Sequence, residues 1–328
     1  MIQNGWVIYK IKYIFYKSSN AYLNNKPTKT KHNIYSLVEC GSFYGDGYPS
    51  FSDESNYEYA YYLNNKTYII YMPVIFKCRT NDAYYLKVLA DLLSNNLHSG
   101  CFDISKDGIN VRAMDANRKI LIDLTLLADN FSTFIYNRPD VMSLGINLSY
   151  LHRMLKTIKK RDIIEIILDS DNPTNLALKT IPKENTRVTV SWVRIQSIQK
   201  IEVELPVGYG KPIIVNSSEF CKMIRDLNIG SLINISSCMT NIIFTCDAGG
   251  IMKRSVEFGE KDSDVVETSY SHDFLTEQIS KISKISGLSP YMHIFPAQDL
   301  PLLFKSNVGN IGTISIYIKS KTQVEDEK

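Results

Sequence analysis

The chain has 328 residues, enough for two domains that each bury a hydrophobic core. Its 37 basic and 34 acidic residues nearly cancel, so any affinity for nucleic acid must come from where the charges sit. The six cysteines form no CxxC pair, which argues against a zinc site or a disulfide framework and favours free thiols in a reducing compartment. No apolar run approaches the roughly 18 residues of a membrane span, so we expect a soluble intracellular protein.

Residues 1–71 differ in composition from the rest of the chain. They hold most of the 21 tyrosines, mixed with Asn, Ser and Gly. Only "KTYIIY" at 66–71 resembles a strand, and the remainder shows no sustained period. We therefore expect a poorly ordered N-terminal extension followed by a functional body that begins at Met72.

From Met72 the pattern becomes regular. An apolar strand at 72–78 precedes a helix, and alternating apolar residues between turn signals then predict an antiparallel meander over 102–124. The same order returns further along the chain. Four helices are predicted in all, at about 82–94, 148–159, 217–228 and 273–285.

Two of these helices lie in nearly repeated sequences, "INLSYLHRMLK" (146–156) and "VNSSEFCKMIR" (215–225). Asn147 matches Asn216, and Arg153 matches Lys222 in an alignment without gaps. The chain is thus predicted to be an α+β tandem of strand-helix-strands units, with two units in each of two similar domains.

Each helix places apolar residues on one stripe and basic residues on the opposite face. If the helices share one side of the sheets, the result is a positive surface suited to phosphates. No aromatic residue is expected among these charges, and no Asn or Gln accompanies Arg as in a base-reading helix, so the contact should be independent of base sequence. The candidate DNA-binding residues are Lys87, Arg153, Lys156, Lys160, Lys222, Arg225, Lys281 and Lys284.

Three stretches carry a family resemblance. They are "CFDISKDGINVRAMDANRKILIDL", "LGINLSYLHRMLK" and "SSEFCKMIRDLNIGSLINIS", and they resemble the eukaryotic-type sliding clamp, proliferating cell nuclear antigen. The resemblance runs from about Met72 to Lys321 in the same order. It implies the DNA clamp fold, with helices on one face of curved antiparallel sheets. The implied division is an extension at 1–71, an N-terminal clamp domain at 72–194, a connecting linker at 195–211, a C-terminal clamp domain at 212–322 and an acidic tail at 323–328.

Membership of that family implies a processivity factor for DNA replication and repair. Three copies would form a ring around duplex DNA, loaded by an ATP-driven clamp loader. The ring would tether a DNA polymerase and other proteins with short plug motifs, such as a ligase or a nuclease. The richness in Ile, Asn, Lys and Tyr is typical of AT-rich genomes, such as those of some large DNA viruses or protozoan parasites. We expect a nuclear protein if the source is cellular, and a cytoplasmic replication factory or the nucleus if it is viral.

The resemblance also implies two further sites. Subunit joints would pair the strands at 187–193 and 252–258 edge to edge. Their residues are Val188, Val190, Trp192, Lys253, Ser255 and Glu257. An apolar pocket beside the linker would take a partner's helical plug. Its residues are Met114, Val203, Leu205, Pro206 and Tyr317.

The chain departs from the family pattern in two places. The linker is less acidic than the family pattern, and Glu277 stands where a basic residue is common. These departures bear on the choice of partners. Two related readings remain open: a subunit of a heterotrimeric checkpoint-type clamp, and a monomeric processivity factor with one open basic face.

The sequence shows no enzyme site. The five histidines share no motif, and "GYG" at 208–210 lacks the lysine and the spacing of a phosphate-binding loop. The acidic stretch at 169–172 is typical of a turn, although a metal-dependent nuclease that uses Asp169 and Asp171 is the alternative from another class. We expect no catalysis, no cofactor and no metal.

Overall fold

The computed structural model describes residues 37–39, 59–63, 66–70, 74–184, 187–199, 202–238, 241–259 and 270–326. The chain divides into two compact units. One comprises Met1–Ile75 and Leu168–Pro173, and the other comprises Phe76–Ile167 and Thr174–Lys328. Both predicted clamp domains fall almost entirely in the second unit.

The first unit contains a small antiparallel sheet of three strands in the order β1-β3-β2. The strands are β1 (Leu37–Glu39), β2 (Tyr59–Leu63) and β3 (Lys66–Ile70). The strand predicted at 66–71 is confirmed by β3. The other two strands carry no alternating pattern that the sequence could reveal, and the rest of the prediction for residues 1–71 lies outside the described residues.

The second unit repeats one order of elements four times, with a strand, a helix and then strands. In its N-terminal half the elements are β4 (Val74–Thr80), α1 (Ala83–Asn96), β5 (Ser99–Ser105), β6 (Gly108–Met114), β7 (Ile120–Leu127), the 3-10 turn η2 (Ala128–Asn130), β8 (Thr133–Tyr136), β9 (Met142–Asn147), α2 (Leu148–Leu155), β10 (Ile163–Asp169), β11 (Asn175–Ile181) and β12 (Thr189–Arg194). In its C-terminal half they are β13 (Ile213–Asn216), α3 (Ser217–Asp226), β14 (Leu232–Cys238), β15 (Asn241–Asp247), β16 (Lys253–Gly259), β17 (Tyr270–Leu275), α4 (Thr276–Lys281), the 3-10 turn η3 (Ser283–Gly287), β18 (Tyr291–Phe295), β19 (Leu302–Val308), β20 (Gly312–Ile318) and α5 (Lys321–Glu325). The predicted α+β tandem is confirmed.

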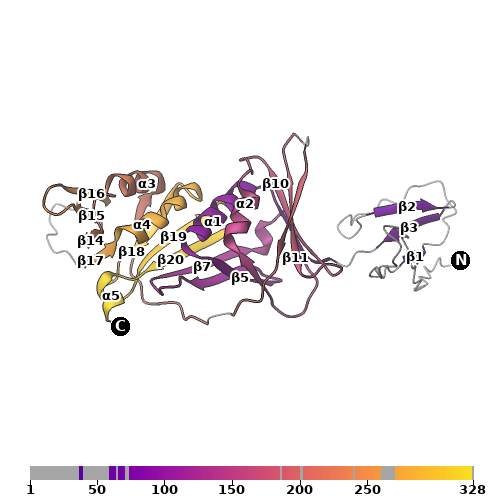
Figure 1. Cartoon of the computed structure of the whole chain (residues 1–328), viewed down its shortest axis with the longest axis horizontal. Helices are drawn as coiled ribbons and strands as arrows, with labels where there is room; N and C mark the ends of the chain where they lie inside the picture. Colours follow the sequence, from indigo (N-terminus) through magenta and orange to yellow (C-terminus); the bar gives the residue numbers. More distant parts are fainter. Residues whose placement is uncertain are drawn as a thin grey trace, which may run out of the picture. The chain divides into compact units, whose positions relative to one another are not determined.

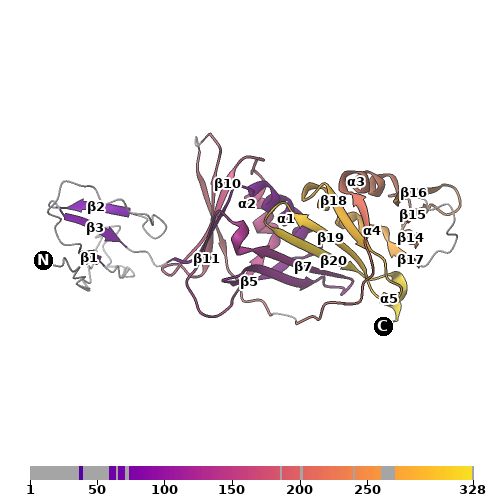
Figure 2. The same cartoon turned by 180° about the vertical axis from the view of Figure 1, so that it is seen from behind.

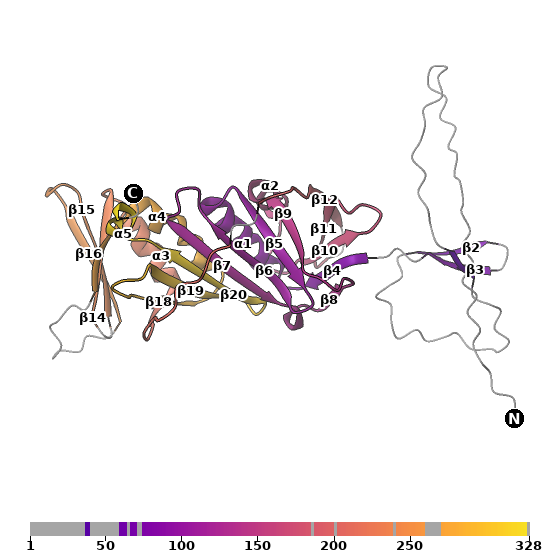
Figure 3. The ribbon, with the colours of Figure 1, turned by 90° about the horizontal axis from the view of Figure 1, so that it is seen from below.

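One eight-stranded sheet joins the two halves. Its order is β13-β18-β19-β20-β7-β6-β5-β9, and the pairs are antiparallel. The halves meet where β20 pairs with β7, with Ile316 opposite Ile122 and both side chains fully buried. Figure 3 shows these strands side by side across the molecule. Two smaller sheets complete the unit, with the orders β12-β11-β10-β4-β8 and β16-β15-β14-β17.

The helices α1 and α2 lie on one side of the central sheet. Figure 1 and the reverse view in Figure 2 both place α1 and α2 above β5, β7 and β20, while the linker after β12 runs along the opposite side. The apolar stripe of α1, which includes Leu86, Leu89 and Leu93, is buried as the 3.6-residue period predicts. The helices α1 and α2, which carry predicted DNA-binding cations, and the linker therefore lie on opposite sides of the same sheet.

The helices α2 and α3 begin in the same way. The side chain of Asn147 accepts a hydrogen bond from the backbone of Tyr150, and Asn216 accepts two from Ser218 and Glu219. An Asn at this position satisfies backbone N–H groups that have no partner within the helix. The matched Asn residues of the sequence repeat are thus matched helix caps.

The fourth predicted helix, at 273–285, is wrong in its boundaries. Residues 270–275 form strand β17, which pairs with β14, and helix α4 begins only at Thr276. The chain then changes to the 3-10 turn η3 after Lys281. Serine at 280, 283 and 286 favours side-chain bonds to the backbone over a continuous helix, and Ser280 and Ser286 make such bonds to Thr276 and Ser283.

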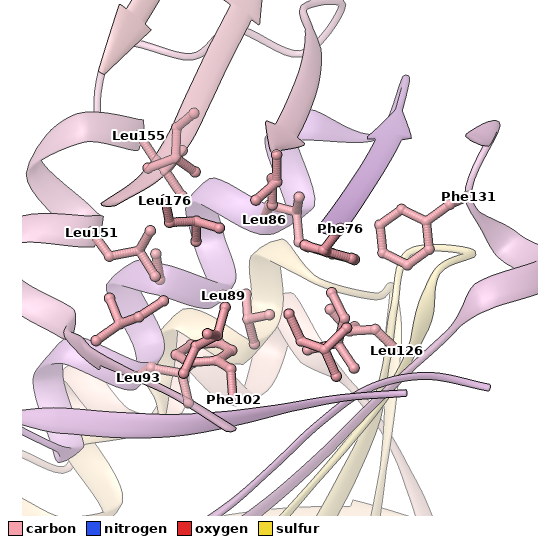
Figure 4. Close-up of a pocket in the computed structure, with 17 residues that line it drawn as sticks. Phe76, Leu86, Leu89, Leu93, Phe102, Leu126, Phe131, Leu151, Leu155 and Leu176 are labelled. Carbon is pink, nitrogen blue, oxygen red and sulfur yellow. The ribbon is translucent and has the colours of Figure 1, made fainter. Parts of the chain in front are cut away.

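A small apolar cavity of about 60 Å³ lies between helices α1 and α2 and the sheets of the N-terminal half. Figure 4 shows Leu89, Leu93 and Phe102 on one side of it and Leu151 and Leu155 on another. Its lining side chains are all apolar, so a water inside would lack hydrogen-bond partners. The cavity is a packing feature that offers no group for chemistry. None of the helices in the described part of the chain combines the length and apolarity needed to span a membrane.

Candidate nucleic-acid interface and partner pocket

The free positive charge of the helical face is concentrated at α2. Arg153, Lys156 and Lys160 are exposed and form no ion pair with any acidic residue in the described part of the chain. Arg153 lies on α2 opposite the buried Leu151 and Leu155, whereas Lys156 and Lys160 lie in the turn that follows, because α2 ends at Leu155 and not at the predicted residue 159. Exposed cations without an acidic partner can contact phosphate groups.

The cations of the C-terminal half are largely compensated. Lys222 Nζ lies 2.7 Å from Glu219 Oε1, and Lys281 Nζ lies 2.7 Å from Glu277 Oε1. The hydrogen bond and the charge of Lys281 lower the pKa of Glu277, so this carboxylate stays ionised. Arg225 is exposed and donates to Cys221 Sγ at 3.4 Å.

A third ion pair links the two halves of the second unit. Lys284 in the C-terminal half lies 2.9 Å from Asp91 Oδ2 on α1, and His152 Nδ1 on α2 lies 3.7 Å from the other oxygen of the same carboxylate. Asp91 therefore sits at the meeting point of three helical segments. It reduces the positive charge that Lys284 contributes to this face.

The expectation that no aromatic residue lies among the cations is wrong. The ring of Tyr84 on α1 has Lys160 Nζ at 5.6 Å and Lys87 Nζ at 6.0 Å from its centroid. Lys87 is half-buried and donates to the carbonyl oxygen of Ile158 at 2.7 Å, which ties α1 to the end of α2. Tyr150, three residues before Arg153 on α2, is 55% exposed. Each tyrosine precedes a cation of its own helix by three residues, and this spacing places the ring and the cation on one face of that helix.

The two strands predicted as subunit joints both lie at sheet edges. β12 is outermost in the five-stranded sheet and pairs with β11, while β16 is outermost in the four-stranded sheet and pairs with β15. On β12 and just before it, Val188, Val190 and Trp192 are exposed. Large apolar side chains on an open strand edge are typical of a surface that another chain covers.

The predicted joint residues of β16 are polar and exposed. Lys253, Ser255 and Glu257 alternate along the strand on one side. The hydroxyl of Ser255 lies 3.0 Å from that of Thr245, and Glu257 accepts a hydrogen bond from Asn241 at 2.7 Å. These cross-strand bonds hold the outer strand against β15 while its other edge remains open.

The linker packs on the sheet face opposite the helices. Val203 and Leu205 from the linker and Met114 from β6 pack against a buried cluster that contains Tyr317. Pro206 is half-buried beside Leu205. Four of the five predicted pocket residues thus share one apolar cluster.

Two aromatic residues of this cluster were not predicted. The ring of Tyr209 packs edge-on against that of Phe295, with 6.1 Å between the ring centroids, and its centroid also lies 6.1 Å from that of Tyr317. Its hydroxyl donates to the carbonyl oxygen of Pro301 at 2.6 Å. Burial of the hydroxyl raises the pKa of Tyr209. The signal in the sequence was an aromatic residue between two glycines near the end of the linker. Phe295 gave no signal, because β18 meets the linker only in the folded chain.

Arg112 on β6 ties the linker to the sheet. Its Nε lies 2.8 Å from Asp123 Oδ1, and its Nη1 donates to the carbonyl oxygen of Val203 at 3.3 Å. A polar groove of about 650 Å³, lined also by Glu202 and Glu204, lies at this junction. Arg112 therefore holds the linker at Val203 against the sheet, next to the apolar cluster.

Residues 169–172, which the alternative prediction assigned to a metal site, form a turn. The backbone N–H of Asn172 donates to the carbonyl oxygen of Asp169 at 3.3 Å. Within the described ranges, no group of three or more His, Cys, Asp or Glu side chains has the arrangement of a metal site. The five described cysteines are free thiols, and burial raises the pKa of Cys78.

A family model describes part of this arrangement. Residues 75–204 match the N-terminal domain of proliferating cell nuclear antigen. The match covers the N-terminal half of the second unit together with the first part of the linker. The C-terminal half repeats the same order of strands and helices and continues the same central sheet. The match and the clamp fold support a sliding clamp of the proliferating cell nuclear antigen family, with residues 75–204 as its N-terminal domain.

Proposed function

We propose that three copies of this chain close into a ring around duplex DNA and serve as a processivity factor. The observation that carries the proposal is the pair of open edge strands, β12 in one half and β16 in the other. Two different edges on one chain allow head-to-tail pairing, in which β12 of one copy meets β16 of the next. Such pairing closes into a ring when the rotation between copies fits a whole number of subunits.

The cationic helical face would line the hole of that ring. Its cations suit phosphate groups, whose contacts carry no sequence information. Each contact is weakened by salt, so the protein can move along the duplex while the closed ring prevents escape. In this arrangement the protein holds DNA by topology and has no need of high affinity.

A topological experiment tests this proposal. The full chain is loaded on nicked circular DNA with a clamp loader and ATP, separated from free protein, and then challenged with a nuclease that linearises the circle. We expect the protein to remain on the circle and to leave after linearisation. Equal retention on both forms would indicate ordinary binding and would support the monomeric open-face reading.

The apolar cluster under the linker would take a short helical plug from a partner. Leu205→Ala with Tyr317→Ala should weaken the binding of a peptide that carries a glutamine and two aromatics by more than tenfold, because the plug loses its apolar contacts. Fluorescence anisotropy of a labelled peptide measures the loss. Val207→Ala is the matched control, since Val207 belongs to the same linker and is 82% exposed. An unchanged affinity in the double variant would place the pocket elsewhere.

The partners follow from this function. We propose that the ring tethers a DNA polymerase, is opened by an ATP-driven loader and also holds plug-bearing proteins such as a ligase or a nuclease during replication and repair. It would act as a scaffold with no catalytic activity and no cofactor. Its place would be the nucleus in a cellular organism, and the nucleus or a cytoplasmic replication factory in a viral infection. A chain that assembles only with two different partners would instead be a heterotrimeric clamp subunit.

A further inference from the structure

We propose that the face of α2 that carries Tyr150 and Arg153 also binds single-stranded nucleic acid, with an unpaired base stacked on the ring of Tyr150. This inference goes beyond encirclement of a duplex. It rests on the local arrangement of an aromatic ring and free cations on one helix, and it does not require a closed ring.

The ring of Tyr150 is available to a ligand. It is 55% exposed on a helix whose buried stripe is formed by Leu148, Leu151 and Leu155. Within the described residues, its hydroxyl makes no hydrogen bond and its ring contacts no other aromatic ring. By contrast, the ring of Tyr84 already carries Lys160 and Lys87 and serves to position those cations.

The spacing of the cations suits one strand. Arg153 is three residues after Tyr150 on α2, and Lys156 is three residues after Arg153 at the C-cap of the helix, so each side chain neighbours the next in a row that winds partly around the helix. Neighbours in such a row are about 5–6 Å apart, close to the distance between successive phosphates in an extended strand. A phosphate on Arg153 would leave the attached base within reach of Tyr150.

Only an unpaired base can use the ring. Cations alone suffice to hold a duplex by its phosphates, whereas an aromatic face among cations is the arrangement by which proteins bind single strands without sequence preference. The counterpart of Tyr150 in the C-terminal repeat is Glu219, which instead pairs with Lys222. The structure therefore assigns this site to α2 and not to α3.

The test compares strands with and without bases. Fluorescence anisotropy is measured on the full chain with a 20-nucleotide oligo-dT, the same length of oligo-rU, an abasic 20-mer and a 20-base-pair duplex. We expect Tyr150→Ser to weaken binding of the oligo-dT about tenfold while duplex and abasic affinities stay unchanged. Tyr150→Phe should retain the wild-type affinity, because the ring and not the hydroxyl stacks.

Two controls separate stacking from charge. Tyr291→Ser removes a tyrosine of similar exposure, 57%, from strand β18 and should change nothing. Arg153→Ser should weaken binding to all four nucleic acids and lower the salt dependence, whereas Tyr150→Ser should leave the salt dependence as it is. Comparison of the affinities for oligo-dT and oligo-rU shows whether the site prefers single-stranded DNA, prefers RNA or accepts both.

The inference is overturned if Tyr150→Ser leaves oligo-dT affinity unchanged, or if it weakens the abasic strand as much as the strand with bases. Failure of the proposed ring function can be distinguished from failure of this single-strand site. A chain that stacks single strands but leaves circular and linear DNA at the same rate keeps this site and loses the ring.

Discussion

Reversal of Arg153 and Lys156 to Glu should lower the affinity for duplex DNA about 100-fold at moderate salt, because each change removes a phosphate contact and adds a repulsive charge. The same double reversal at Lys222 and Arg225 makes an equal change in net charge on the equivalent helix. Its effect should be smaller, since Glu219 already neutralises Lys222 across 2.7 Å. The difference between the two variants reports the asymmetry of the helical face.

The measurement is anisotropy of a labelled duplex over a series of salt concentrations. The slope of log affinity against log salt should fall by roughly 0.9 for each phosphate contact removed. Neither variant should change the oligomer mass. If the mass falls, the face has been misplaced and belongs to a joint. Equal losses in the two variants would contradict the asymmetry.

The second large effect should come from the strand edge of β12. Val190→Lys with Trp192→Lys places two charges on side chains that are 39% and 60% exposed, so the free energy of unfolding should change little. Pairing with another edge should be lost, because charged residues on an outer strand prevent edge-to-edge association. Light scattering should then give the mass of one chain. Tyr291→Lys is the matched control and should leave the mass unchanged.

A mixing experiment makes the head-to-tail geometry explicit. Ser255→Lys with Glu257→Lys should disable the β16 edge and also give single chains. Each variant retains the edge that the other lacks, so an equal mixture should form two-chain assemblies and stop there. Recovery of three-chain assemblies from the mixture would contradict the pairing of β12 with β16.

The sequence could predict the parts of this molecule that repeat. The caps Asn147 and Asn216, the apolar stripes of the helices and the edge character of the strand at 252–258 all depend on residues close together in the chain. The N-terminal boundary of α4 could not be predicted. Residues 270–275 are followed by apolar residues at helical spacing, and only pairing with β14 makes them a strand.

The features that the sequence missed depend on contacts between distant residues. Asp91 and Lys284 meet across the two halves of the unit, and Lys87 meets the carbonyl of Ile158. The candidate pocket was incomplete because Phe295 reaches Tyr209 only after the strands pair. Charge compensation at Lys222 was nevertheless visible, since Glu219 precedes it by three residues on one helix.

The solution mass of the purified full chain tests the central claim most directly. Multi-angle light scattering over a hundredfold range of concentration should give the mass of three chains, each of 37.4 kDa. A single-chain mass that persists at the highest concentration would contradict the closed ring and leave the open-face or heterotrimeric reading in its place.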